Sequence, residues 1–303
     1  MKTFLQSRLL LGIIISNVVT LLIIWLNNLL HSEKDGILVF SEFVILPLLM
    51  GVISAWFWRD LNLKSRALIW YSILNGFLAI LLSYIFLKEG TICLIIVSPL
   101  IFAFVITGAF FGKAMFRKRN QTLNVSVVSL LLVVFIADSI SEHHYRNMVS
   151  DEVIIKARPE KIWKNVVAFE KIKQANSYWL FKAGMPSPMQ TTVTAYKKGA
   201  GRKCIFSNGY VFDEKIVIFD VNKDLTFDII GQPQDPEIMG HIDIERGQFL
   251  LKDNGDGTTT LVGNSWYSLK VFPIWYYDLW AESITRNVHL RVMDHIKVLS
   301  EKN

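Results

Sequence analysis

The sequence predicts a two-part protein, with a membrane α-helical domain over residues 1–140 and an α+β soluble domain over residues 148–303. Residues 1–140 hold nearly all the long uncharged apolar runs, whereas charged residues recur every few positions after about Met148. The second half contains a series of short alternating segments and then one long helical pattern. Such an order is typical of a curved antiparallel sheet that is covered by a single helix.

Five apolar segments predict transmembrane helices, because a helix needs about 20 apolar residues to cross a bilayer. No small-residue cleavage site follows the first segment, so we expect a retained helix rather than a signal peptide. The fifth segment is short and ends before Asp138. The segments are residues 9–29, 37–57, 67–87, 91–111 and 123–137.

The basic residues of the first half indicate how these helices are oriented. Residues 1–147 hold 12 basic and 7 acidic residues, whereas residues 148–303 hold 20 and 19. The basic excess lies before the first segment and in the loops after the second and fourth, which predicts a cytoplasmic N-terminus. With five spans the soluble domain lies outside the cell membrane, and without the fifth span it is cytoplasmic. Because the excess follows membrane topology, we expect no nucleic-acid partner.

The centres of the predicted spans carry no ionisable residue, which favours a membrane anchor over a transporter or channel. The segment from Gly108 to Gly112 matches the GxxxG pattern that lets two membrane helices pack closely. Membrane lipids are therefore the expected surroundings of this half.

The soluble half reads as a strand, a helix and a run of antiparallel strands before the final helix. Residues 153–157 form a strand pattern, and Pro159 then opens a helix. Asn208-Gly209 and residues 253–257 are hairpin signals between alternating segments. From Pro273 to about Leu299, apolar residues keep the spacing of one buried helix face.

Several motifs in this half are similar to those of a known superfamily. The strand-to-helix junction from Ala157 to Trp163 (A-R-P-E-K-I-W) is similar to the pattern A-P-x-x-V-W, although Arg158 replaces the usual apolar residue before proline. The other motifs are G-R-x-C-x-F at 201–206, E-x-I at 214–216, D-G-T-T at 256–259 and the final helix.

Through these motifs, residues 150–303 resemble the START-like or SRPBCC superfamily of polyketide cyclase/dehydrase and lipid-transport proteins. The resemblance implies a helix-grip fold, in which the sheet wraps around the C-terminal helix and a ligand cavity lies between them. The superfamily includes lipid carriers, quinone-binding proteins, hormone receptors and cyclases, so the fold does not select one function. The membrane half resembles no family.

The predicted ligand-binding residues are aromatic side chains near the cavity mouth and polar groups that would anchor a ligand. Arg202 and Glu214 lie opposite each other if the chain turns at Asn208-Gly209, and a buried pair would hold a polar head group. The alternatives are an exposed cross-strand pair and, for the rings, an ordinary core or a contact with the membrane interface. The set is Trp179, Arg202, Phe206, Glu214, Trp266, Tyr276, Trp280 and His289.

Other ionisable residues favour structural roles. His241, Asp243 and Glu245 alternate on one strand and would suit a metal, but a solvated outer face is the favoured interpretation. Arg291 and His295 lie on the final helix, where cationic groups complement the helix dipole. We predict no catalytic residue, metal or cofactor, and we interpret both cysteines as buried apolar side chains.

These observations favour a membrane-anchored domain that binds a hydrophobic small-molecule ligand such as a lipid or an isoprenoid. One alternative is a cyclase- or hydrolase-type enzyme that uses the same cavity, with Arg202, Glu214 or His289 as acid–base groups. Another is a membrane protein that senses its ligand. The sequence predicts no oligomeric state.

Overall fold

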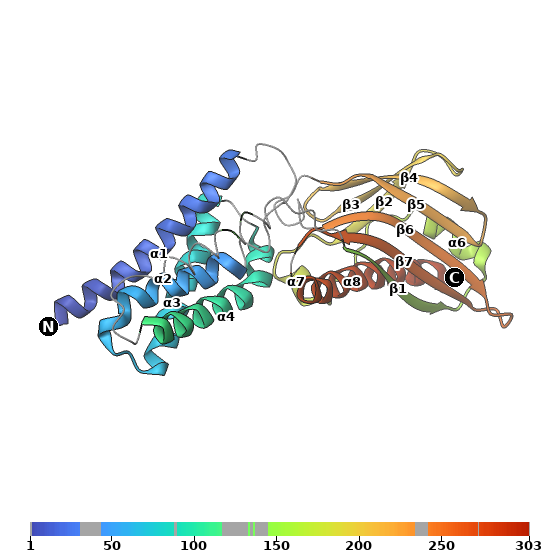
Figure 1. The fold of residues 1–303 in the computed structure, drawn as a ribbon. Coiled ribbons are helices and arrows are strands. Elements are labelled where there is room, and N and C mark those ends of the chain that lie inside the picture. The colour runs from blue at the N-terminus through green and yellow to red at the C-terminus, as the bar shows by residue number, and fades with distance from the viewer. Residues whose placement is uncertain are drawn as a thin grey trace. The chain divides into compact units, whose positions relative to one another are not determined.

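The computed structural model describes residues 2–30, 44–87, 90–116, 133, 136, 145–233, 242–271 and 273–302. The chain forms two compact units, Met1–Glu142 and His143–Asn303. Each unit has its own set of packed elements (Figure 1).

The N-terminal unit is helical. Its elements are α1 (Lys2–Leu30), α2 (Leu46–Trp58), η2 (Arg59–Leu61), α3 (Ser65–Leu82), η3 (Ser83–Leu87) and α4 (Thr91–Phe116). Among the described residues, three stretches are long and apolar enough to cross a membrane, and they match the first, third and fourth predicted spans. They are Ser7–Leu26, Ser65–Phe86 and Thr91–Phe116.

The other two predicted spans are described only in part. Within the second segment, α2 has 13 residues, and residues 37–43 lie outside the described part of the chain. Of the fifth segment, 123–137, only Val133 and Ile136 are described. The number of spans and the side of the membrane on which residues 145–302 lie therefore stay predictions.

Glycines bring α2 and α4 into backbone contact. A Cβ atom added to Gly108 would lie 2.1 Å from the carbonyl oxygen of Leu48, and one added to Gly51 would lie 2.2 Å from that of Val105. A Cβ atom added to Gly112 would likewise clash with Ala55. The GxxxG packing predicted for Gly108 and Gly112 is confirmed, and Gly51 supplies the matching surface on the partner helix.

A buried polar network joins three helices of this unit. Asn75 of α3 accepts a 2.6 Å hydrogen bond from the Asn17 amide of α1 and donates to the hydroxyls of Ser54 (2.9 Å) and Ser16 (3.1 Å). All four side chains are almost fully buried. Hydrogen bonds between polar side chains on neighbouring apolar helices help to hold those helices together.

The C-terminal unit is one seven-stranded antiparallel sheet with helices on one face. Its strands are β1 (Tyr145–Ile155), β2 (Pro188–Val193), β3 (Gly201–Phe206), β4 (Val211–Asp220), β5 (Asp224–Gly231), β6 (Ile242–Asp253) and β7 (Thr259–Leu269). Their order is β1-β7-β6-β5-β4-β3-β2. The helices are α6 (Pro159–Val167), α7 (Trp179–Lys182) and α8 (Ile274–Glu301).

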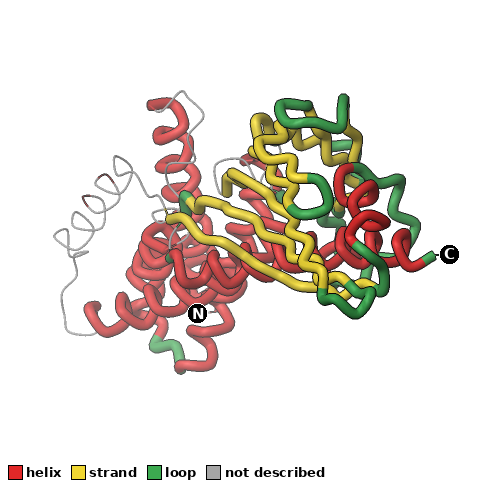
Figure 2. Tube along the Cα trace, turned by 90° about the vertical axis from the view of Figure 1, so that its right-hand side faces the viewer, coloured by secondary structure: helices red, strands yellow, loops and turns green. Residues whose placement is uncertain are grey.

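The sheet curves around α8, which lies along its inner face (Figures 1 and 2). α8 packs against β1 and β7 at one edge of the sheet and against β2 at the other. The predicted architecture of a curved antiparallel sheet with a long C-terminal helix is confirmed. The hairpin between β3 and β4 also turns as predicted, with Gly209 at a φ of +87° that suits glycine.

One strand differs from the prediction. β1 begins at Tyr145, eight residues before the predicted start, and pairs with β7 along its whole length. Before Val153, polar residues occupy inward positions of this strand, including Asn147 and Asp151, and they bond to α8. The alternation of apolar and polar residues that signals a strand is therefore absent there.

Candidate functional site

The interior between the sheet and α8 contains a close-packed core at one end. Around the second half of α8, Val292, Met293 and Ile296 belong to a continuous core with Ile162 and Trp163 of α6. Met293 and Ile296 are fully buried. This end provides the close-packed core that stabilises the unit.

Apolar residues of the first half of α8 and of the sheet are only half-buried. Tyr277, Ile284 and Val288 are half-buried on one flank of α8. In the sheet, Ile244 of β6 is half-buried, and Ile229 of β5 is half-buried where it packs against the core. Half-buried apolar side chains are able to line a ligand-binding interior.

Arg202 and Glu214 form a buried ion pair within this interior. They are direct partners in the β3–β4 pairing, and their side chains are 2% and 4% exposed. The Arg202 guanidinium also donates to the Val167 carbonyl (3.1 Å) and lies 4.4 Å from the centre of the Phe227 ring. Burial raises the pKa of the Glu214 carboxyl, and Arg202 opposes that shift. The predicted pairing is confirmed, and the pair is buried rather than exposed.

A second polar group joins α8 to β1 and β7. His289 Nε2 lies 2.6 Å from Ser265 Oγ, and His289 Nδ1 lies 3.0 Å from an Asp151 carboxylate oxygen. His289 and Asp151 are buried, whereas Ser265 is half-buried on the inner face. Burial lowers the pKa of His289, although Asp151 acts in the opposite direction. A neutral imidazole between a hydroxyl and a carboxylate is able to accept the hydroxyl proton.

A third polar group connects the first turns of α8 to the sheet. The Tyr267 hydroxyl donates to Asp278 (2.7 Å), and the Asn147 amide donates to both oxygens of the same carboxylate (3.0 and 3.1 Å). Burial and the contact with Asp278 raise the pKa of Tyr267. These bonds hold the helix close to β1 and β7 at the end where the apolar interior is half-buried.

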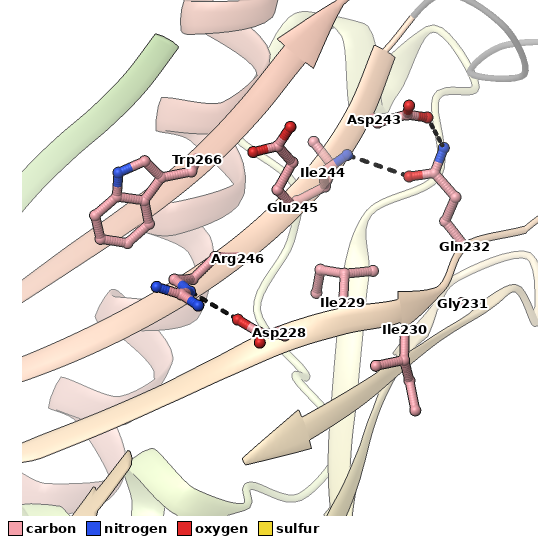
Figure 3. Close-up of a pocket in the computed structure, with 10 residues that line it drawn as sticks. All are labelled: Asp228, Ile229, Ile230, Gly231, Gln232, Asp243, Ile244, Glu245, Arg246 and Trp266. Carbon is pink, nitrogen blue, oxygen red and sulfur yellow. Dashed lines mark hydrogen bonds and ion pairs between the residues drawn. The ribbon is translucent and has the colours of Figure 1, made fainter. Parts of the chain in front are cut away.

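An open cavity of about 790 Å³ lies where β5 and β6 separate (Figure 3). The two strands pair only as far as Asp228 and Arg246. Beyond that point the Gln232 side chain bonds to the backbone of Ile242 and Ile244, in place of a strand neighbour. Ten residues line the cavity, namely Asp228, Ile229, Ile230, Gly231, Gln232, Asp243, Ile244, Glu245, Arg246 and Trp266.

Of the eight predicted ligand-binding residues, only Trp266 lines this cavity, beside the Arg246–Asp228 ion pair (Figure 3). Trp179, Trp280 and Tyr276 form a chain of ring contacts between α7 and the first turns of α8, at 6.2 and 6.4 Å. Phe206 packs against Phe212 at 5.0 Å. The structure thus places the predicted residues in separate groups, and their roles in ligand binding stay predictions.

The described residues among those considered for a metal site do not lie together. Asp243 pairs with Lys270 (2.9 Å) and Glu245 with Arg146 (3.1 Å), while His241 lies outside the described residues. Among the described residues, no group of His, Cys, Asp and Glu side chains is arranged to hold a metal ion. The predicted solvated face accounts for these carboxylates.

Arg291 and His295 have structural roles. The Arg291 guanidinium donates to the carbonyls of Pro188 and Gln174, and His295 contacts the Gln174 side chain and the Glu170 carbonyl. Both side chains therefore fasten α8 to the connection between α6 and β2. Their proximity on the helix was predicted, but these partners were not.

The sequence pointed to His289 but not to Ser265 or Asp151. A lone serine or aspartate within a strand carries no local signal of chemistry, because its partner lies on another element. Asp151 and His289 are 138 residues apart in the chain, and Ser265 and His289 are 24 apart. Only the folded sheet and helix bring the three side chains together.

No protein-family model matches this chain, and no curated protein matches it. Solved structures similar to it include norcoclaurine synthase from Thalictrum flavum, with 12% identity, 54% of this chain and 98% of that chain covered, and a TM-score of 0.38. A protein from Mesorhizobium loti has 18% identity, covers 50% and 96%, and has a TM-score of 0.34. A protein from Bacillus thuringiensis has 12% identity, covers 52% and 100%, and has a TM-score of 0.36.

Because these identities and TM-scores are low, they assign neither an activity nor a ligand to this chain. The helix-grip description rests on the strand order and on the position of α8.

Proposed function

We propose that the C-terminal unit binds a hydrophobic ligand, such as a lipid or an isoprenoid, while the N-terminal helices anchor it to a membrane. The observation that carries the proposal is the group of half-buried apolar side chains on one flank of α8, beside its fully buried face. Met293 and Ile296 are fully buried, whereas Tyr277, Ile284 and Val288 are not. A ligand chain in the half-buried end would bury this apolar surface, at about 25 cal/mol for each Å² removed from water.

The polar anchor that fits this interior best is Ser265 with His289. Arg202 and Glu214 already satisfy each other, and Arg202 also bonds to Val167. Ser265 is half-buried on the inner face and carries a hydroxyl that is able to donate to or accept from a ligand. A hydrophobic molecule with one carbonyl or hydroxyl group matches this combination of apolar walls and one polar group.

Filling the interior should remove a bound ligand. We expect apolar molecules to co-purify with the full chain in detergent micelles, and Val288→Trp to reduce their amount at least about 10-fold, since the larger ring occupies ligand space. Val298→Trp is the matched control, because Val298 lies exposed on the same helix. Solvent extraction and mass spectrometry measure the bound molecules. Equal amounts in both variants, or none in the wild type, would rule out the proposal.

We also propose that the N-terminus is cytoplasmic and the C-terminal unit lies outside the membrane. The support is the distribution of basic residues, which include Arg59 and Lys64 between α2 and α3 and Arg66 in the first turn of α3. A reporter that is active only in the cytoplasm should be silent when fused after Asn303. The same reporter fused after Lys64 should be active. Activity at both positions would place the C-terminal unit in the cytoplasm.

A further inference from the structure

The arrangement of Ser265, His289 and Asp151 has the geometry of a nucleophile, a general base and an orienting carboxylate. In such a set, the base accepts the hydroxyl proton through one ring nitrogen and is held by the carboxylate through the other. Both contacts are present, at 2.6 and 3.0 Å, and they use opposite nitrogens of the His289 ring. Geometry and roles identify such sets, because the order of the residues in the chain varies between folds.

The fold makes room for this arrangement through glycine. Asp151 pairs across the ladder with Gly263, two residues from Ser265 on the same face of β7. A Cβ atom on Gly263 would lie 2.8 Å from Met293 Sδ and 3.7 Å from the His289 ring. The absence of a side chain at this position therefore lets α8 approach β7 closely enough for His289 to reach both neighbouring strands.

Charged and polar side chains from three elements lie around His289. Asp151 of β1 faces one side of the ring, Ser265 of β7 faces the other, and Arg286 of α8 contacts the second Asp151 oxygen at 3.5 Å. The pKa of His289 is lowered, chiefly by burial, so the imidazole is neutral near pH 7 and free to accept a proton.

We propose that Ser265 is a nucleophile that takes the acyl group of an apolar ester, with His289 as its general base and Asp151 as the carboxylate that orients His289. The inference rests on the proposed function for the apolar part of the substrate, whose chain would lie along Ile284 and Val288, beside Ser265. The proposed reactivity of Ser265 does not depend on that function.

The reaction balances without any group beyond water. Ser265 Oγ forms a bond to the ester carbonyl carbon as His289 Nε2 takes the hydroxyl proton. The bond from carbon to the alcohol oxygen then breaks, and His289 returns the proton to the departing alcohol. Water next attacks the acyl-serine through the same base, which releases the carboxylic acid and restores Ser265.

Turnover should nevertheless be slow. β7 lies between β1 and β6, so its backbone N–H groups take part in the two ladders. They are therefore not available beside Ser265 to stabilise a developing oxyanion, a role that accounts for about 10²–10³-fold in enzymes that have it. The covalent step, rather than turnover, is the suitable measurement.

A long-chain alkyl fluorophosphonate tests this step on the full chain in detergent micelles. We expect one adduct, which peptide mass spectrometry locates on Ser265, and Ser265→Ala abolishes it. His289→Gln and Asp151→Asn should slow labelling by about 10²–10⁴-fold. The rate should rise as His289 loses its proton, at a pH below the ordinary histidine value of about 6.5, and should be constant near pH 7 and above. Ser150→Ala is the control, because Ser150 is exposed and is the neighbour of Asp151.

Two results would overturn the inference. One is the absence of an adduct on Ser265 in the wild-type protein. A folding defect of a variant does not explain that result. The other is a labelling rate that does not change with pH or in His289→Gln. Labelling of Ser265 without co-purifying apolar molecules would support the nucleophile and reject the proposed ligand. Ligand loss in Val288→Trp without labelling of Ser265 would support binding and reject the nucleophile.

Discussion

Replacing Arg202 with methionine should lower the free energy of unfolding of the C-terminal unit by about 3–5 kcal/mol. The change leaves the Glu214 carboxyl buried at 4% exposure without its partner. It also removes the bond to the Val167 carbonyl and the contact with the Phe227 ring. Hydrogen exchange of peptides from β3 and β4 measures the effect within the full chain, because exchange reports the free energy of local opening.

Two further variants show whether the effect comes from the unpaired buried charge. The double variant Arg202→Met with Glu214→Leu should recover most of the lost stability, since neither charge is then buried. Lys203→Met is the matched control on the same strand, because Lys203 and Asp213 form an exposed pair at 3.5 Å. Such pairs contribute at most about 1 kcal/mol. An equal loss in Arg202→Met and Lys203→Met would contradict the argument from burial.

Replacing Gly108 with leucine should separate α2 from α4 and lower the thermal stability of the N-terminal unit. The first atom of the new side chain would already lie 2.1 Å from the Leu48 carbonyl oxygen, so the backbone of one helix must move. Overpacking of this kind costs about 1–3 kcal/mol, and sometimes more. Melting of the full chain in detergent micelles, followed by far-ultraviolet circular dichroism, measures the change in the helical signal.

Ala103→Leu is the control for this experiment. Ala103 lies on α4 as well, but it is exposed, so the same side chain is added to the same helix without a clash. We expect this variant to melt at nearly the wild-type temperature. If the two variants melted alike, close packing of α2 and α4 at Gly108 would not be needed for the stability of this unit.

Local patterns predicted most elements of both units. The apolar runs matched α1, α3 and α4, because the length and composition of a membrane helix are properties of one segment. The Asn208-Gly209 turn matched the β3–β4 hairpin, since the turn determines which residues of adjacent strands lie opposite each other. This register also accounts for the correct pairing of Arg202 with Glu214.

The prediction was less accurate where a side chain contacts a residue that is distant in the sequence. The part of β1 before Val153 showed no strand pattern, because Asn147 and Asp151 point inward to meet α8 rather than an apolar core. The network around Asn75 likewise had no signal in the sequence, because its partners lie on α1 and α2.

The sequence by itself determined the division into an apolar helical half and an α+β half, together with the hairpins and the long final helix. Each of these follows from periodicity or turn chemistry within a short segment. Only the tertiary structure decided that Arg202 and Glu214 are buried, that apolar residues on one flank of α8 stay half-buried, and that Ser265 meets His289 and Asp151. Burial and side-chain contact depend on how α8 lies against the sheet, and that arrangement brings together residues that are far apart in the chain.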